Sequence, residues 1–509
     1  MIRVRQIKIL VDKEQNITER IAKRLHIEEE DIVSYELEKK SIDARNKNSI
    51  YYVYDLLVSV KKEKSIPKYV FPKESLSKDK KIIIVGSGPS GLFCAYLLGE
   101  AGYKVLVLEQ GEMMEERIKT VEEFFKTNKL NVFSNVQFGE GGAGTFSDGK
   151  LNTLVKDKMQ RGRKVFETFV EHGAPKEIMY EQKPHIGTDV MRNVIVSMRD
   201  KMKNMGVGFK YNSKMTNVII EKGIVVGVEV NNSEVISCDI LVLAIGHSAR
   251  DTFEMLYNKN IEMKAKNFAV GVRVEHPQKM INENQYGKFA HLLSPASYKL
   301  TYQASNKKAV YSFCMCPGGF VVNASSEEGR VVVNGMSNYK RDEVNANSAI
   351  VVNVNNKDFG NGVLAGMEFQ RKLEEKAYKL GAGLIPTQLY KDFVANKESN
   401  KYGSFAKVSK GMTSFANLRE LFPDSINEAL LEAIPYFDTK IKGFARDDMI
   451  MSGVESRTSS PVMIIRNELG ESSIKGLYPC GEGCGYAGGI TTSAMDGIKI
   501  AELIVQKEN

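Results

Sequence analysis

The feature that most constrains this fold is a hydrophobic run that ends in three closely spaced glycines. Lys81-Ile-Ile-Ile-Val-Gly86-Ser-Gly88-Pro-Ser-Gly91 predicts a strand, a tight turn and the start of a helix. A second hydrophobic run, residues 104–108, follows the helix and ends at Glu109. Strand, glycine turn, helix, strand and acidic residue in this order predict a Rossmann-type unit that binds a dinucleotide.

Each glycine of this first segment has its own predicted role. Gly86 permits the tight turn, Gly88 lets the backbone approach a pyrophosphate, and Gly91 lets the helix pack closely on the strand. The helix N-terminus then directs its amide hydrogens and its positive dipole end at the phosphate. We expect Glu109 to accept hydrogen bonds from both ribose hydroxyls and to disfavour a 2′-phosphate. The segment alone does not distinguish FAD from NAD.

Composition narrows the class of protein. The chain has 509 residues, 42% of them hydrophobic, which predicts two or three domains with large cores. The net charge of +8 is dispersed, and no basic run with interleaved aromatics favours nucleic acid. The hydrophobic runs are too short to cross a bilayer, and the N-terminal sequence does not resemble a signal peptide. Six cysteines without a C-x-x-C pair or zinc-like spacing predict a reducing compartment and no metal site. We therefore expect a cytoplasmic protein.

Four segments are predicted along the chain. Residues 1–75 form a small N-terminal α+β module with a linker, the linker being the proline- and lysine-containing stretch 61–80. Residues 80–250 form the first part of a dinucleotide-binding domain, and residues 451–509 form its second part. Residues 251–450 differ in sequence pattern, because they contain valine-rich strands, and they predict an inserted substrate or cap domain.

Periodicity and turn residues predict the elements inside these segments. In the module we expect a helix with Ile17, Ile21 and Leu25 on one face, capped by Asn16 or Thr18. A polar turn with a local Asp43–Arg45 pair is expected at residues 40–45. The remaining expected strands are 7–11, 32–37, 49–60, 238–245, 268–274, 309–313 and 331–334, with a hairpin at 218–230 and helices at 188–205, 367–380 and 493–505.

Two more glycine-rich segments lie far away along the chain. They are Phe138-Gly-Glu-Gly-Gly-Ala-Gly144-Thr-Phe-Ser-Asp148 and Tyr478-Pro-Cys-Gly481-Glu482-Gly-Cys-Gly-Tyr-Ala-Gly-Gly489-Ile490. The first segment with its continuation Leu92-Phe-Cys-Ala-Tyr-Leu-Leu98 resembles the opening of flavoproteins with the glutathione-reductase-like FAD fold. This resemblance implies an α/β protein whose Rossmann-type FAD-binding domain is discontinuous, with an inserted mixed α+β substrate or cap domain and the small N-terminal α+β module.

A narrower resemblance covers nearly the whole chain. Lys40-Ser-Ile-Asp-Ala-Arg, Phe313-Cys-Met-Cys-Pro-Gly-Gly319, Asn334-Gly-Met-Ser337 and Val454-Glu-Ser-Arg-Thr-Ser-Ser-Pro461, together with the two later glycine segments, resemble a bacterial family of FAD-dependent dehydrogenases, mostly known as uncharacterised NAD(FAD)-utilising proteins. The resemblance implies a flavoprotein and an oxidoreductase, and it supplies no substrate.

The resemblance also implies contacts for FAD. Gly481-Glu482 stands where the superfamily has a Gly-Asp motif that holds the ribityl chain, so glutamate replaces the usual aspartate. The loop at 139–150 corresponds to a segment that wraps the pyrophosphate, although a flexible surface loop is the alternative. The predicted contacts are Gly86, Ser87, Gly88, Pro89, Ser90, Gly91, Glu109, Gln110, Gly141, Gly142, Thr145, Ser147, Val218, Gly246, Gly481, Glu482, Gly489 and Ile490.

Candidates for catalysis are few. Arg457 is suited to clamp an anionic substrate, and its alternative is a structural ion pair with Glu455 or a neighbour. Cys314 and Cys316 would face the same side of a strand, either as buried thiols or as an active-site wall with a redox role. His185 and His247 are candidates for proton donation or flavin contact, and Arg273 and His276 are weaker candidates; each has a structural alternative.

The expected function is hydride transfer through FAD to or from a small-molecule substrate, with an anionic substrate favoured by Arg457. Because no second G-x-G-x-x-G follows a strand, a dedicated NAD(P)H domain is not expected, and NAD(P)H would visit the flavin as a transient electron donor. The alternatives are a flavin monooxygenase on the same fold, a flavin-dependent RNA-modifying or RNA-binding protein, and a flavoprotein in which flavin is structural. Dithiol flavoenzymes carry their cysteine pair soon after the first glycine segment, and here that region holds only Cys94, an expected core residue, which argues against such a reductase. Cys480 and Cys484 flank Gly481-Glu482 and are expected to be packing residues, with a place near the flavin as the alternative.

Overall fold

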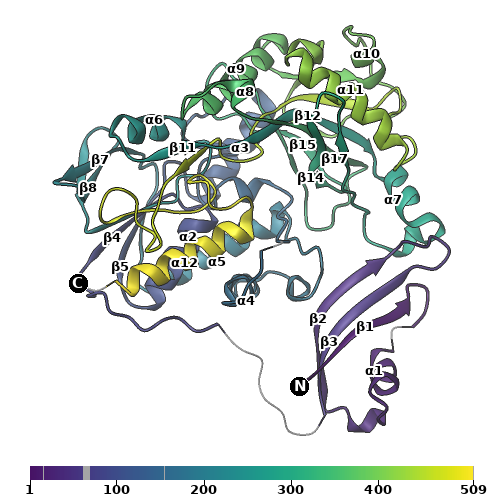
Figure 1. Cartoon of the computed structure of the whole chain (residues 1–509), viewed down its shortest axis with the longest axis horizontal. Coiled ribbons are helices and arrows are strands. Elements are labelled where there is room, and N and C mark those ends of the chain that lie inside the picture. The colour runs from purple at the N-terminus through teal and green to yellow at the C-terminus, as the bar shows by residue number, and fades with distance from the viewer. Residues whose placement is uncertain (15, 61–68, 154, 508–509) are drawn as a thin grey trace.

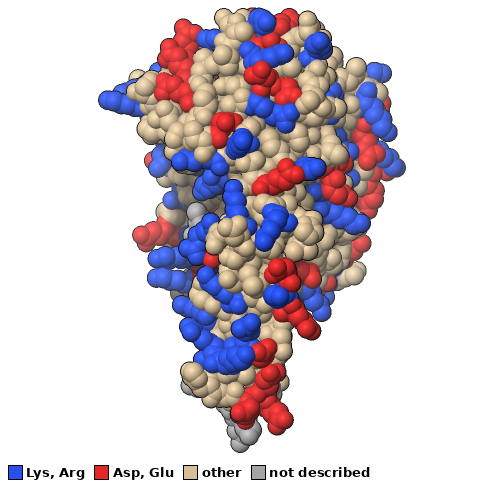
Figure 2. All heavy atoms as spheres, turned by 90° about the vertical axis from the view of Figure 1, so that its right-hand side faces the viewer, with Lys and Arg blue, Asp and Glu red and all other residues tan. Residues whose placement is uncertain are grey.

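The computed structural model describes residues 1–14, 16–60, 69–153 and 155–507. The N-terminal module lies at one end of the molecule (Figure 1) and forms its narrow lower end in Figure 2. Strands β1 (Ile2–Leu10), β3 (Tyr51–Ser59) and β2 (Ser34–Asp43) form an antiparallel sheet in that order, and α1 (Ile17–Leu25) packs on it through Ile21. The Asn16 side chain accepts a hydrogen bond from the Glu19 amide, which confirms the predicted cap.

The module is joined to the rest of the molecule through β2. This strand runs through Asp43, so the predicted polar turn at 40–45 is wrong for its first four residues, although Arg45 does pair with Asp43 at 2.7 Å. Pairing with β3 extends β2 into the polar sequence as far as Asp43. The Lys40 amide donates to the Tyr180 carbonyl at 2.7 Å, and the Lys40 ammonium lies 3.1 Å from the Glu181 carboxylate.

The predicted linker at 61–80 lies partly outside the described residues, at 61–68. From 69 to 80 the chain contains no helix or strand. It is nevertheless held in place, because Leu76 is buried and the amides of Ser75 and Leu76 both donate to the Val505 carbonyl. This part of the linker therefore packs along the end of the C-terminal helix.

A five-stranded parallel sheet forms the centre of the dinucleotide-binding region. Its order is β23 (Leu477–Pro479), β10 (Ile240–Leu243), β4 (Lys81–Val85), β5 (Lys104–Leu108) and β6 (Gly208–Lys210). The predicted strand, helix and strand are present, and the strand predicted at 238–245 is shorter than expected. β23 comes from the far end of the chain, so distant segments meet in one sheet.

Two cores cover the two faces of this sheet, because successive strand side chains point in opposite directions. Ile82 and Ile84 face the helices α2 (Pro89–Glu100), α5 (Thr188–Asn204) and α12 (Ile490–Val505). Ile83 and Val85 face a three-stranded meander and α6 (Arg250–Asn258). The meander comprises β7 (Met215–Glu221), β8 (Ile224–Val230) and β9 (Glu234–Ser237), and its first turn confirms the predicted hairpin. In Figure 1, α12 lies alongside α2.

A seven-stranded sheet forms the second large unit, above the first in Figure 1. Helices α9 (Ala365–Leu380) and α11 (Asp424–Asp438) contribute to its hydrophobic core. The strand order is β13 (Thr301–Gln303), β14 (Ala309–Cys316), β17 (Asn345–Val354), β12 (Phe268–Pro277), β21 (Ile450–Glu455), β18 (Ile385–Leu389) and β20 (Thr413–Phe415).

The place of β21 bears on the predicted division at 450/451. β21 pairs with β12 and β18, so we would move that boundary to follow Glu455. The other described helices and strands are α3 (Met114–Thr127), α4 (Arg161–Glu171), α7 (Gln278–Tyr286), α8 (Asn356–Phe359), α10 (Tyr390–Val394), β11 (Met263–Ala265), β15 (Phe320–Asn323), β16 (Val333–Met336), β19 (Ser409–Lys410) and β22 (Val462–Ile464). Within the described residues, no helix combines the length and hydrophobicity needed to span a membrane.

Candidate functional site

A cavity lies at the carboxyl edge of the five-stranded sheet, where ligands of open α/β sheets bind. All three glycine segments line it, through Gly86 and Gly88, Gly142 and Gly144, and Gly488 and Gly489. The opposite wall comes from the seven-stranded sheet and the segments next to it, through Phe313, Cys314, Asn334 and Glu455. Folding therefore brings together three segments that are far apart in the sequence, between two sheets.

Two of the helices that begin at this cavity follow glycine segments and have the features of a phosphate site. Gly88 is the N-cap of α2 and Gly489 is the N-cap of α12, and neither helix has a side-chain cap. The first amides of both helices are therefore available to a ligand. A Cβ on Gly488 or Gly489 would meet no atom within 4 Å, and one on Gly88 would meet its nearest atom at 3.9 Å. The glycine segments at the starts of α2 and α12, called the glycine cradle below, thus leave space where an anionic ligand would approach the backbone.

Glu109 has a larger structural role than the sequence indicated. Its Oε2 accepts from the Ser87 amide at 2.9 Å and the Ser87 hydroxyl at 2.7 Å. Its Oε1 accepts from the amides of Gly111 and Gly139, each at 3.0 Å. A carboxylate has about four acceptor positions, so these donors already use its capacity. Glu109 lines the cavity, and it also ties the first glycine segment to the second.

The predicted FAD contacts divide into two groups. The described cavity wall contains Gly86, Gly88, Pro89, Ser90, Glu109, Gln110, Gly142, Ser147, Gly246, Glu482, Gly489 and Ile490. It does not contain Ser87, Gly91, Gly141, Thr145, Val218 or Gly481.

The predicted contacts outside the cavity wall lie in the protein core or beside a smaller cavity. A Cβ on Gly91 would lie 1.9 Å from the Gly86 carbonyl oxygen, which fits its predicted packing role. Gly141 and Thr145 line a small separate cavity. Val218 is fully buried in the core beneath the meander, and Met215 of the same strand lines the main cavity instead.

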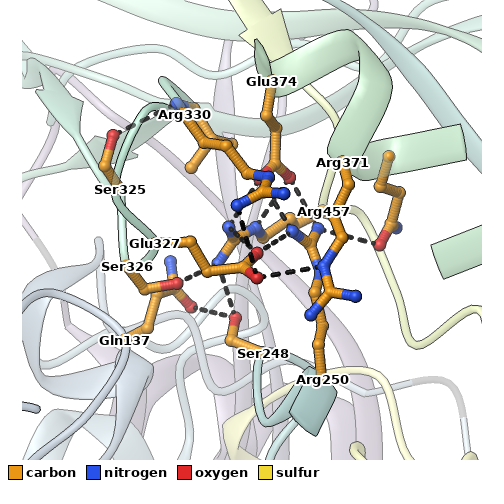
Figure 3. A network of polar contacts seen from close by, with 12 residues as sticks. Gln137, Ser248, Arg250, Ser325, Ser326, Glu327, Arg330, Arg371, Glu374 and Arg457 are labelled. Atoms are coloured by element: carbon orange, nitrogen blue, oxygen red, sulfur yellow. Dashed lines mark hydrogen bonds and ion pairs between the residues drawn. The ribbon is translucent and has the colours of Figure 1, made fainter. Parts of the chain in front are cut away.

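Arg457 is not available to clamp an anion. It lines the cavity, but its Nε and Nη2 donate to the two carboxylate oxygens of Glu374 at 2.9 and 2.7 Å. Its Nη1 donates to the hydroxyls of Ser248 and Ser326 at 2.9 and 2.6 Å (Figure 3). The anion-clamp prediction is therefore wrong. The structural ion pair is present, with Glu374 as the partner rather than Glu455.

The two cysteines of the C-x-C sequence do not face the same side. A β-bulge lies between Phe313 and Cys316, and Cys314 has a φ of 44°. The bulge breaks the alternation that the prediction assumed. Cys314 is exposed and lines the cavity, whereas Cys316 is buried, 3.7 Å from the Lys150 ammonium. Burial raises the pKa of the Cys316 thiol, and the Lys150 ammonium opposes that shift.

The side chains of His185, Arg273 and His276 make contacts within the protein. The described cavity wall does not include His185, which stacks on Tyr339 and has its Nε2 2.8 Å from the Tyr339 carbonyl oxygen. Burial lowers the pKa of His185 to about 4. Arg273 pairs with Glu455 through two contacts of 2.9 and 3.1 Å, and His276 Nε2 lies 2.7 Å from a carbonyl oxygen. The structure does not bring His185 to the cavity.

Of His185, His247, Arg273 and His276, His247 alone belongs to the described cavity wall. Its Nε2 lies 4.0 Å from Glu482 Oε1, and both residues line the wall. Burial raises the pKa of Glu482 to about 7, and the nearby Lys266 opposes this shift. Gln137, Ser248 and Asn334 also line the cavity wall, and none of them was predicted as a site residue. No pattern marks them, because each reaches the cavity only through the path of its loop or strand.

Three family models match parts of the chain. Residues 267–458 match "FAD-dependent protein, C-terminal domain-like", residues 84–120 match an NAD(P)-binding Rossmann-like domain, and residues 1–59 match a domain of unknown function. An uncharacterized protein of Clostridium beijerinckii is 47% identical over 99% of both chains. An L-amino acid oxidase of Bothrops pictus is 50% identical over 60 residues, which is 12% of this chain and 11% of that protein.

Two solved structures show a weak similarity to this chain. A glycine oxidase from Bacillus cereus has a TM-score of 0.39 and 10% identity, covering 85% of this chain and 99% of its own. An L-proline dehydrogenase from P. horikoshii has a TM-score of 0.39 and 13% identity, covering 84% of this chain and 94% of its own. Scores of this size do not identify a substrate.

Proposed function

This chain belongs to a family of FAD-dependent oxidoreductases, and on that premise we propose that it transfers hydride between FAD and a small molecule held against the seven-stranded sheet. One observation carries the proposal. A single cavity joins the glycine cradle of the five-stranded sheet to a second wall from the inserted domain. The arrangement supports a glutathione-reductase-like FAD domain that is interrupted by a substrate domain.

The residues of the cradle would hold and orient FAD. The uncapped N-termini of α2 and α12 would offer their free amide hydrogens to the anionic part of FAD. Bound FAD supplies the acceptor or donor of the electron pair. Glu109 keeps Ser87 and Gly139 in place, so that the first two glycine segments present a rigid surface. This preorganisation lowers the entropy cost of binding.

The substrate would lie on the side of Phe313, Cys314 and Asn334. Arg457 and Arg273 lie at or behind this wall, and both are paired with carboxylates. Their charges are therefore neutralised, and nothing in their geometry favours an anionic substrate. The apolar ring of Phe313 and the amide of Asn334 suit a small molecule that combines an apolar part with hydrogen-bonding groups.

NAD(P)H is the electron donor that we propose to test first. It would enter the same cavity and meet the flavin directly. The purified protein should be yellow and release FAD on denaturation. Under anaerobic conditions NADH, NADPH and a panel of reduced metabolites are then mixed with it, and flavin absorbance is followed.

Bleaching by one of these donors, with no stoichiometric oxygen use in air, supports a dehydrogenase or reductase. Stoichiometric oxygen and NAD(P)H use would instead support the monooxygenase alternative. A colourless protein that does not take up FAD contradicts the proposal as a whole.

A further inference from the structure

A chain of hydrogen bonds in the cavity wall fixes the ring of His247. At its start, the side-chain amide nitrogen of Gln137 donates to the Ala324 carbonyl oxygen at 3.3 Å. The other end of the amide, Oε1, is thereby directed at the Ser248 hydroxyl, 3.1 Å away. An amide oxygen only accepts hydrogen bonds, so the Ser248 hydroxyl must donate its proton to it.

The state of Ser248 decides the tautomer of His247. Ser248 has one proton, which goes to Gln137, and its oxygen also accepts from Arg457 Nη1 at 2.9 Å. The remaining contact of this oxygen is to His247 Nδ1, at 3.1 Å. That contact requires a proton on Nδ1, because the hydroxyl has no second one to give. In the neutral ring Nε2 therefore carries a lone pair.

The charges around His247 keep the ring neutral. Its pKa is lowered to about 3, first by burial and then by the guanidinium groups of Arg457 and Arg250. Arg457 follows β21 and Arg250 begins α6, and Figure 3 shows both grouped around Glu374 of α9. The Glu374 carboxylate opposes the shift without cancelling it. Glu482, on the loop after β23, also lies near the ring, with its Oε1 4.0 Å from Nε2.

The Nε2 lone pair is open to a ligand. Glu482 Oε1 is 4.0 Å away, which exceeds hydrogen-bond distance. His247 follows Gly246 at the end of β10, between β4 and β23, so it lies at the dinucleotide end of the cavity. Building on the proposed function, we propose that His247 Nε2 accepts a hydrogen bond from a hydroxyl group of bound FAD. Gln137, Ser248 and Arg457 act as positioning residues that select this tautomer.

The first test reads the tautomer directly. The protein is prepared with ¹⁵N-histidine, and long-range proton–nitrogen correlation spectra are recorded without and with FAD; His247→Gln identifies the signal. We expect a protonated Nδ1 and an unprotonated Nε2 in the ligand-free protein. Ser248→Ala should allow both tautomers. Ser326→Ala is the matched control, because Ser326 also accepts from Arg457 Nη1, and the structure records no contact between Ser326 and His247. A protonated Nε2 in the unaltered protein would overturn the inference.

The second test measures FAD affinity by fluorescence quenching. His247→Phe keeps an aromatic ring but removes the acceptor, and we expect a dissociation constant about three- to tenfold higher, as the loss of one hydrogen bond implies. His247→Gln, whose side-chain oxygen accepts, should recover part of the affinity. Equal affinity in all three proteins would contradict the role of His247. Failure of the unaltered protein to bind FAD would contradict the proposed function instead. If His247→Phe does not fold, the Ser248→Ala spectra still decide the tautomer.

Discussion

Gly88 and Gly91 lie three residues apart, yet a side chain at each position would meet a different obstacle. A Cβ on Gly91 would lie 1.9 Å from the backbone oxygen of Gly86, inside the turn itself. A Cβ on Gly88 would contact the protein no closer than 3.9 Å and would extend into the cavity. One glycine is thus required by the fold and the other by the ligand.

This contrast gives a matched pair of substitutions. We expect Gly88→Ala to unfold thermally near the unaltered protein while binding FAD at least about tenfold more weakly, because the methyl group occupies the approach of the pyrophosphate. Gly91→Ala should destabilise the protein by about 1–3 kcal/mol, since overpacking forces the helix from the strand. Thermal unfolding without FAD and flavin titration separate the two effects. Equal destabilisation by both substitutions would contradict this assignment.

Glu482 should make the stability of the FAD-free protein depend on pH. Its pKa is raised from an ordinary value of 4.5 to about 7, chiefly by burial, so the folded state binds a proton that the unfolded state releases. Its stabilising contribution is complete below about pH 4.5 and is lost as pH rises through 7. We expect Glu482→Gln to be about 1–3 kcal/mol more stable than the unaltered protein at pH 8 and nearly equal at pH 5. Urea unfolding at both pH values tests this, and a difference that does not change with pH would contradict it.

At the scale of one element, the bulge in β14 determines which thiol reaches the cavity. The alternation of a regular strand would place Cys314 and Cys316 on one face. The extra residue in the bulge turns Cys314 outward and leaves Cys316 beneath, near Lys150. Such bulges recur beside functional sites because they redirect a side chain.

The bulge predicts a single reactive thiol. In the FAD-free protein we expect N-ethylmaleimide to modify Cys314 first, because the other five cysteines are buried. Bound FAD should slow the reaction by covering the cavity wall. Peptide mass spectrometry identifies the site, and Cys314→Ser is the control that should remove the fast phase. Preferential modification of Cys316 would contradict the described geometry.

At the scale of the whole molecule, the two large units meet through a buried ionic network (Figure 3). Glu374 of α9 accepts two hydrogen bonds from Arg250 and two from Arg457. Arg250 begins α6, which packs on the meander beside the five-stranded sheet, while α9 contributes to the core of the seven-stranded sheet. The network therefore sets how the two walls of the cavity face one another.

Removing the Glu374 carboxylate that the two arginines share should destabilise the protein. We expect Glu374→Gln to destabilise the protein by about 3–5 kcal/mol, because it removes the carboxylate that two buried guanidinium groups share and leaves Glu327 as their remaining counter-charge. Glu375 is the matched control: it is the next residue, it is exposed, and it pairs with Lys379. Glu375→Gln should change stability by less than about 0.5 kcal/mol. Urea unfolding of both variants tests this, and similar effects would show that the network does not stabilise the junction.

The sequence by itself determined the dinucleotide unit and the glycines that build it. The spacing of Gly86, Gly88 and Gly91 is a local steric pattern, and the hydrophobic period of the neighbouring residues defines strand and helix without distant partners. The same holds for the N-cap Asn16 and the hairpin at Lys222-Gly223. Steric fit, capping and turn formation involve residues that are close in the sequence, so the sequence alone predicts them.

Only the tertiary structure decided the partners of the polar side chains. Glu374 lies 83 residues from Arg457, and no spacing rule connects them. The hydroxyl of Ser248 donates to the side chain of Gln137, which lies 111 residues away in the sequence, so only the folded chain brings the two together. Whether a guanidinium is free to bind a ligand depends on which carboxylates the fold places within hydrogen-bond distance, and that depends on how two sheets pack. The cradle was therefore predictable, and the chemistry of the wall facing it was not.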